Sequence, residues 1–192
     1  MNKTKRNIFQ IAIKLFSEKG YDNTSIEEIT AVAGVAKGSL YYHFSKKEDI
    51  FDLLLEEGIK LLKNSIEIKT RDAKTALDKL KAVILVQIKV SVKYEDLISV
   101  IFTQMWGKES KNLKCQKVAF DYIEIIKDII REGIANGEFY DGDVDALAAG
   151  VFGVTYSSLL YRMKVKDNHE IDVQKVYNGF VDTVVRGISK KI

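Results

Sequence analysis

Apolar residues recur at helical spacing along nearly the whole chain. Three stripes stand out, and each predicts one buried face of a helix. They contain Ile8, Ala12, Leu15 and Phe16; Leu77, Leu80, Ile84 and Ile88; and Tyr122, Ile126, Ile129 and Ile130. No segment shows the alternation of a strand, and the chain has no proline, which sheet-rich folds use in their turns. The pattern therefore predicts an all-α fold of about nine helices.

Two short helices are predicted near the amino terminus. Ser25 and Glu28 have the spacing of a capping box and open the first helix, which Gly34 ends. The second helix carries Leu40 and Phe44 on one face. A capped helix, a glycine turn and a second short helix form the outline of a helix-turn-helix, whose second helix enters the major groove of DNA.

Longer helices are predicted in the rest of the chain. Ser45 and Glu48 repeat the capping-box spacing and predict the start of a long helix. Two further helices are expected at about 144–163 and 173–189, separated by a polar stretch.

The second short helix has an outward face with unusual chemistry. At roughly 100° per residue, Leu40 and Phe44 point inward together. The outward face then consists of Gly38, Ser39 and Tyr42, with Lys37, Tyr41 and His43 on its flanks. Residues 37–47 hold three lysines (Lys37, Lys46 and Lys47) and no acid, a local basic patch that the net charge of +3 conceals. Polar faces on ordinary packed helices are the simpler interpretation of each feature alone, but their combination favours contact with base edges and phosphates.

These residues form a pattern that resembles a known family. The segments GYDNTSIEEI (20–29), AGVAKGSLYYHF (33–44) and KEDI (47–50) are similar to the signature of the TetR family of bacterial transcriptional regulators. The resemblance covers about the first quarter of the chain. One departure is Ala36, where many members carry a serine or threonine cap; a missing cap costs about 0.5–2 kcal/mol of helix stability.

The resemblance implies double-stranded DNA as a partner. The contacting residues would be Thr24, Ser25, Lys37, Gly38, Ser39, Tyr41, Tyr42, His43 and Lys47. Among them, Lys37, Ser39 and Tyr42 would carry most of the base recognition, and Gly38 would allow the backbone to approach the groove. The phosphate contacts would fall to Ser25, more weakly Thr24, and to Tyr41, His43 and Lys47.

The same resemblance implies a homodimer and an effector. The last two helices, about 144–163 and 173–189, would pair with their copies in a second subunit; the alternative is that helix 144–163 is an internal core helix of a monomer. An unknown small-molecule effector would bind among the middle helices, although each bulky residue there is also compatible with plain core packing. The candidates are Phe102, Met105, Trp106, Phe120, Tyr122, Phe152 and Tyr156. Residues 1–50 would then form the DNA-binding domain and residues 51–192 the ligand-binding and dimerisation domain.

Other classes of function find little support in the sequence. Two histidines and one cysteine show no metal-ligand spacing, and no phosphate-binding glycine loop or nucleophile elbow is present, so we expect no enzyme, metal or cofactor. The single cysteine suits a reducing cytoplasm, no signal peptide is evident, and the longest uncharged run, 146–161, is too short and too polar to span a membrane.

We therefore predict a cytoplasmic, ligand-responsive regulator, usually a repressor in this family, that binds a palindromic operator. The alternative is a helical enzyme or small-molecule-binding module whose first helices only resemble the motif. An activator or a ligand-independent regulator also remains open from the sequence.

Overall fold

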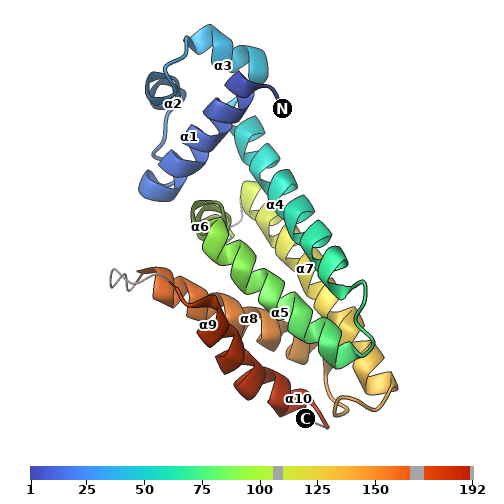
Figure 1. Ribbon diagram of the computed structural model, residues 1–192. Helices are drawn as coiled ribbons and strands as arrows, with labels where there is room; N and C mark the ends of the chain where they lie inside the picture. Colours follow the sequence, from blue (N-terminus) through green and yellow to red (C-terminus); the bar gives the residue numbers. More distant parts are fainter. Residues whose placement is uncertain (106–109, 165–170, 191–192) are drawn as a thin grey trace. The chain divides into compact units, whose positions relative to one another are not determined.

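The computed structural model describes residues 1–105, 110–164 and 171–190 (Figure 1). Within these ranges the chain is helical, and a single isolated bridge between Phe139 and Ser189 is the only β pairing. The helices are α1 (Lys3–Lys19), α2 (Ile26–Ala33), α3 (Lys37–His43), α4 (Lys47–Thr70), α5 (Ala76–Lys93), α6 (Glu95–Thr103), α7 (Ser110–Ala135), α8 (Val144–Lys164), α9 (Val173–Phe180), the π-helical turn η1 (Val181–Val185) and α10 (Arg186–Ile188). The predicted all-α fold is confirmed. No helix in the described part is long and apolar enough to cross a membrane.

Packing divides the chain into two compact units. The first comprises Met1–Lys60 and Asp96–Val118, and the second comprises Leu61–Glu95 and Ala119–Ile192. Helices α4 and α7 each contribute to both units. The boundary between the units falls within α4 after Lys60 and within α7 after Val118.

The core of the first unit is built on α1. Its predicted stripe of Ile8, Ala12, Leu15 and Phe16 is buried as expected. The Tyr21 ring lies between the rings of Phe16 and Phe51, with centroids 5.0 Å from each. Asn2 caps the start of α1 by accepting a hydrogen bond from the Lys5 amide at 2.8 Å, and Gly20 ends the helix with a φ of +87°.

The second unit is organised around α5, which packs against α8 and α9. Both predicted stripes are buried in this unit, apart from the half-buried Leu77. The Glu138 carboxylate caps α5 from a distant part of the chain, because it accepts hydrogen bonds from the amides of Ala76 and Leu77 at 3.1 and 3.0 Å. Gly133 leaves room for the fully buried ring of Phe139, which would overlap a side chain at this position.

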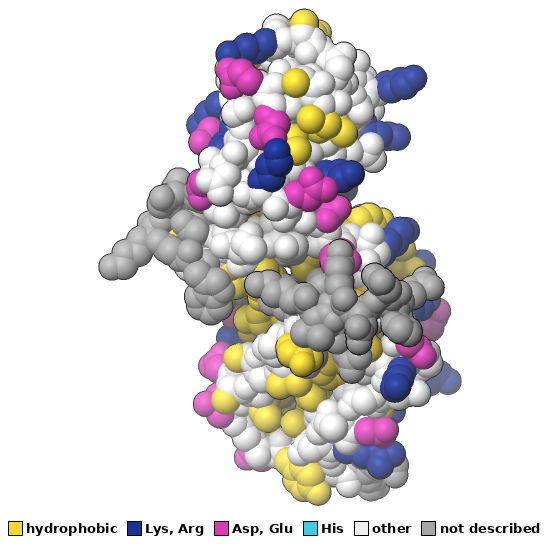
Figure 2. Space-filling model, turned by 90° about the vertical axis from the view of Figure 1, so that its left-hand side faces the viewer, with side chains coloured by type: hydrophobic (Ala, Val, Ile, Leu, Met, Phe, Trp, Pro, Cys, Tyr) yellow, Lys and Arg dark blue, Asp and Glu magenta, His cyan; other side chains and the backbone are white. Residues whose placement is uncertain are grey.

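One face of α8 is not covered by the described residues of the chain. Its exposed residues include Ala146, Ala149, Gly150, Gly153, Val154 and Ser157, while Ala148, Val151 and Thr155 face the core. Figure 2, which looks onto the left side of Figure 1, shows apolar side chains gathered over the region of α8 and α9. An exposed helix face made of small and apolar residues is unusual for a surface that remains in water.

One sequence-based expectation about a helix end is wrong. Helix α4 begins at Lys47, so Asp49 occupies its third position, and this carboxylate accepts from the amides of Ser45 and Lys46 at 2.8 and 3.2 Å, the role that the spacing assigned to Glu48. The final helix covers the predicted range of about 173–189, and the π-helical turn η1 lies within it. There the Thr183 hydroxyl donates to the Gly179 carbonyl at 2.7 Å, a contact that bends helices.

Candidate nucleic-acid interface

Local capping produces the predicted pair of short helices. The Ser25 hydroxyl oxygen accepts a hydrogen bond from the Glu28 amide at 3.1 Å and caps α2. Gly34 ends α2 in the left-handed conformation, with φ of +65°, and the next amide, that of Val35, donates to the Thr30 carbonyl at 3.1 Å. Helix α3 follows at once from Ala36, which makes no side-chain capping bond, as the sequence predicted.

The inner face of α3 is firmly held. Leu40 and Phe44 are buried, and the Lys5 ammonium on α1 lies 5.0 Å from the centre of the Phe44 ring. The side-chain amide of Asn7, also on α1, donates to the Ala33 carbonyl at 3.0 Å and joins α1 to the end of α2. Helix α3 is therefore fixed by packing and by its neighbours although it lacks a cap of its own.

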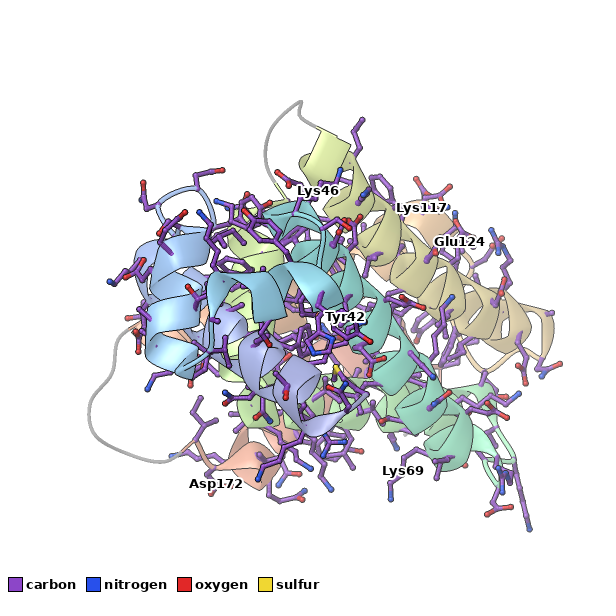
Figure 3. The ribbon with its side chains drawn as sticks, turned by 90° about the horizontal axis from the view of Figure 1, so that it is seen from above. Tyr42, Lys46, Lys69, Lys117, Glu124 and Asp172 are labelled. Carbon is purple, nitrogen blue, oxygen red and sulfur yellow. The ribbon has the colours of Figure 1, made fainter. Side chains whose placement is uncertain are left out.

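The outer face of α3 is open, as its sequence predicted. Tyr42 is 84% exposed, and in the view from above it projects from α3 (Figure 3). Its ring meets the ring of His43 edge to face, with centroids 4.9 Å apart. Gly38 is exposed, and a side chain there would meet nothing within 4 Å. This largely exposed aromatic side chain contributes little to the core and is accessible to a partner.

The lysines beside α3 differ in their surroundings. Lys37 forms an ion pair with Glu27 on α2, and this contact raises the pKa of the lysine while it lowers the pKa of the carboxyl group. Lys46 is exposed just beyond α3 (Figure 3). Binding to DNA would require Lys37 to exchange its bond with Glu27 for one with DNA, whereas Lys46 is available as it stands.

Two of the predicted phosphate contacts face inward instead. The Lys47 ammonium donates to the carbonyls of Tyr21 and Thr24 at 2.8 and 2.9 Å and lies 4.3 Å from the centre of the Tyr21 ring. The Thr24 side chain is buried, and its hydroxyl lies 2.9 Å from the Gly20 carbonyl. Ser25 is different, because its oxygen caps α2 while its hydroxyl proton remains available to a phosphate.

Sequence reasoning did not include the first turn of α1 in the interface. Lys3 and Arg6 are exposed there and line a shallow surface groove together with Val35, which belongs to the turn of the helix-turn-helix. The signal was available in the basic start of the chain, but only packing places that segment beside the turn between α2 and α3.

The predicted effector residues are only partly brought together. Tyr122, Phe152 and Tyr156 form an aromatic cluster in the second unit, with centroid distances of 5.8 Å from Tyr122 to Phe152 and 4.6 Å from Phe152 to Tyr156. Phe120 is 62% exposed on the surface. Phe102 and Met105 belong to the first unit, and Trp106 lies outside the described residues. In the part of the chain that is described, no group of acidic, histidine or cysteine side chains is placed to hold a metal ion.

An exposed recognition helix held by two others, with lysines beside it, defines a helix-turn-helix DNA-binding protein. Comparison with known proteins supports this assignment to the helix-turn-helix class. The family model "Bacterial regulatory proteins, tetR family" matches residues 8–54, and the model "Tetracyclin repressor-like, C-terminal domain" matches residues 73–159. The chain belongs to the TetR family and is a DNA-binding, ligand-responsive transcriptional regulator.

Similar proteins match along almost their whole length. The chain is 28% identical over 188 residues to the fatty acid metabolism regulator protein of Bacillus subtilis (strain 168), covering 96% of this chain and 95% of the relative. It is 27% identical over 190 residues to the transcriptional regulator QacR of Staphylococcus aureus (strain Mu50), covering 97% and 98%. A solved structure from Clostridium perfringens, described as a fatty acid metabolism regulator, has 29% identity and a TM-score of 0.86, covering 96% of this chain and all of that one. These relatives are regulators, so the alternative of a helical enzyme is not favoured.

Proposed function

We propose that the chain regulates transcription as a homodimer on a palindromic operator, with α3 in the major groove. A small-molecule effector changes the affinity of the dimer for DNA. The observation that carries this proposal is the open outer face of α3, where Tyr42 and Gly38 have no role in the core. One short helix reads only a few base pairs, so a unique site needs two such helices related by two-fold symmetry. In this proposal residues 1–50 bind DNA, and residues 51–192 bind the effector and the second subunit.

The side chains of the interface divide into two roles. We assign base recognition to Lys37, Ser39 and Tyr42, and close backbone approach to Gly38. Phosphate contacts fall to Ser25, Tyr41 and His43, with Lys46, Lys3 and Arg6 as further candidates because all three are exposed in the first unit. Lys47 and Thr24 serve the interface by holding the segment that carries Ser25, because their polar groups are bonded within the protein.

The exposed faces of α8, α9 and α10 are the proposed dimer interface. Gly150 and Gly153 on α8, Gly179 on α9 and Gly187 on α10 are all exposed, and a side chain at any of them would meet nothing within 4 Å. Small residues let helix backbones approach closely, and the apolar surface beside them on α8 needs cover. Pairing with the same helices of a second subunit would bring the backbones close together and would cover the apolar surface.

We place the effector in the second unit, against the aromatic cluster of Tyr122, Phe152 and Tyr156. Two relatives are named for fatty acid metabolism and a third is QacR, so relatedness alone does not select one effector. An effector acts by binding more tightly to one spacing of the two recognition helices than to another, and its differential affinity sets the change in DNA binding.

Selection of bound sequences from random duplex DNA tests the proposal. The full-length protein should recover an inverted repeat whose half-sites lie about one helical turn, or a multiple of it, apart. Binding to this repeat should weaken steeply with salt, and an unrelated duplex of the same length should bind far less tightly. Recovery of a single half-site, or of no preferred sequence, would contradict the proposal.

A further inference from the structure

The core of the second unit contains a side-chain amide whose hydrogen bonding is incomplete among the described residues. Gln87 on α5 is 1% exposed, and its side-chain oxygen accepts a hydrogen bond from the Tyr122 hydroxyl at 2.8 Å. Its side-chain nitrogen, Nε2, is buried and has no hydrogen-bond partner among the described residues. A buried N–H without a partner destabilises the folded state, and a methionine of similar size would avoid that cost. An acceptor oxygen on a bound molecule would complete the hydrogen bonding of this amide.

A second polar group lies one helical turn further along α5. Ser91 is also 1% exposed, and its hydroxyl lies beside the Tyr156 phenol without reaching full hydrogen-bond geometry among the described residues. It lies close enough to the Tyr156 phenol to offset part of the rise that burial causes in the pKa of that group. Gln87 and Ser91 share one face of α5, on the side of the aromatic cluster, since Gln87 contacts Tyr122 and Ser91 lies beside Tyr156.

No buried side chain in the described part of the chain is charged at neutral pH. The buried polar residues of the described chain are Thr24, Thr30, Gln87, Ser91, Gln104, Thr155 and Ser189, none of them ionisable at neutral pH. Burial raises the pKa of Tyr156 to about 12 and that of Tyr122 well above its usual range, so both phenols stay protonated. A carboxylate or an ammonium group buried here would lose its hydration and would meet no buried opposite charge among the described residues.

We propose that the effector is a neutral, largely apolar molecule whose carbonyl or equivalent acceptor oxygen accepts a hydrogen bond from Gln87 Nε2. Its apolar part lies against Tyr122, Phe152 and Tyr156, and the Ser91 hydroxyl supplies a second polar contact. This inference rests on the proposed function, because it names the chemistry recognised by the effector site placed in the second unit. It adds Gln87 and Ser91, which supply the directional contacts, to the aromatic residues that supply the contact area.

Prodan, a neutral naphthalene dye with one ketone, is a suitable probe because its emission moves to longer wavelength when the ketone accepts a hydrogen bond. The full-length wild-type protein should bind Prodan saturably, with the emission of a hydrogen-bonded ketone. Gln87→Met should weaken binding about tenfold, equivalent to about 1.4 kcal/mol, and move the bound emission to shorter wavelength. Ser91→Ala should weaken binding less. Gln10→Met, an exposed glutamine on α1, is the matched control and should change neither quantity.

Two further measurements separate recognition from damage to the fold. Because Gln87→Met leaves the Tyr122 hydroxyl without its acceptor, the double variant Gln87→Met/Tyr122→Phe removes both partners and should melt close to the wild type. Dimethylaminonaphthalene, the same ring system without the ketone, should bind wild type and Gln87→Met equally. A wild-type protein that binds no Prodan, or a Gln87→Met variant with unchanged affinity and emission, would overturn the assignment. Equal competition by an anionic naphthalene sulfonate would also overturn it.

The outcome is independent of DNA binding. Operator binding by the wild-type protein in the absence of dye measures the proposed function by itself. Failure of the wild type to bind any duplex specifically would refute the proposed function. Failure of the dye experiment with operator binding intact would refute only the ligand assignment.

Discussion

Replacing Gly150 by leucine tests the proposed dimer interface without touching the core of one subunit. Gly150 is exposed on α8, and a Cβ at this position would meet no described atom of its own chain within 4 Å. Within one subunit the change should be neutral or stabilising, since glycine is about 0.8–1 kcal/mol worse than alanine inside a helix and leucine is nearly as good as alanine. Any loss must therefore come from a second molecule.

The size of that loss follows from packing. Forcing extra methylene groups into a closely packed contact costs about 1–3 kcal/mol. A two-fold interface contains the substitution twice, so the dissociation constant of the dimer should rise by roughly 30-fold or more. Gly150→Ala should have a much smaller effect, because one methyl group adds little volume and improves helix propensity.

Sedimentation equilibrium from nanomolar to micromolar concentration measures the dissociation constant, and circular dichroism reports the helical fold. Ala135→Leu, at an exposed position near the end of α7, is a control for adding a large apolar side chain elsewhere. Gly150→Leu should also bind the palindrome less tightly although no residue of the DNA interface has changed. A leucine variant that dimerises as tightly as the wild type, or a wild type that stays monomeric at micromolar concentration, would refute the reasoning.

The remaining predictions concern DNA and pH. Tyr42→Ala should weaken operator binding by about 1–3 kcal/mol and flatten preference at one base position, as measured by binding to a panel of operator variants. Lys46→Ala should lower the slope of log affinity against log salt by about 1 for all sequences and leave the melting temperature unchanged. Lys47→Ala should weaken binding to all sequences and also lower the melting temperature, because its ammonium holds two backbone carbonyls. Burial raises the pKa of Tyr156 to about 12, so the unfolded chain releases this proton at a lower pH than the folded protein does. The free energy of unfolding should therefore fall between pH 10 and pH 12 by up to about 1.4 kcal/mol per pH unit. Urea titrations of Tyr156→Phe should show a smaller slope.

Specific results would contradict the predictions for Tyr42, Lys47 and Tyr156. Unchanged base preference in Tyr42→Ala would mean that α3 is turned differently in the groove. A normal melting temperature in Lys47→Ala would show that its inward bonds are dispensable. An alkaline stability curve in Tyr156→Phe that matches the wild type would show that this phenol does not retain its proton in the folded state.

The sequence alone determined the features whose causes lie within a few residues. The Ser25 cap, the left-handed Gly34 and the inward placement of Leu40 and Phe44 were all predicted, because caps and helix periodicity depend on partners three or four positions away. The outward direction of Tyr42 followed from the same periodicity. Ser45 and Glu48 show the limit of such reasoning, since two carboxylates next to each other compete for one cap and the start of the helix selects Asp49.

The tertiary structure alone decided the features that join distant segments. The Lys47 ammonium bonds to carbonyls 23 and 26 positions away, so a side chain that suits a phosphate by its place in the motif is turned inward. The Glu138 carboxylate caps α5 across 62 positions, and the need for Gly133 became apparent only when Phe139 was seen packed against it. Gln87 was missed for the same reason. A glutamine at a buried helical position has no local signature, and only the surrounding helices show that its amide nitrogen is enclosed without a partner.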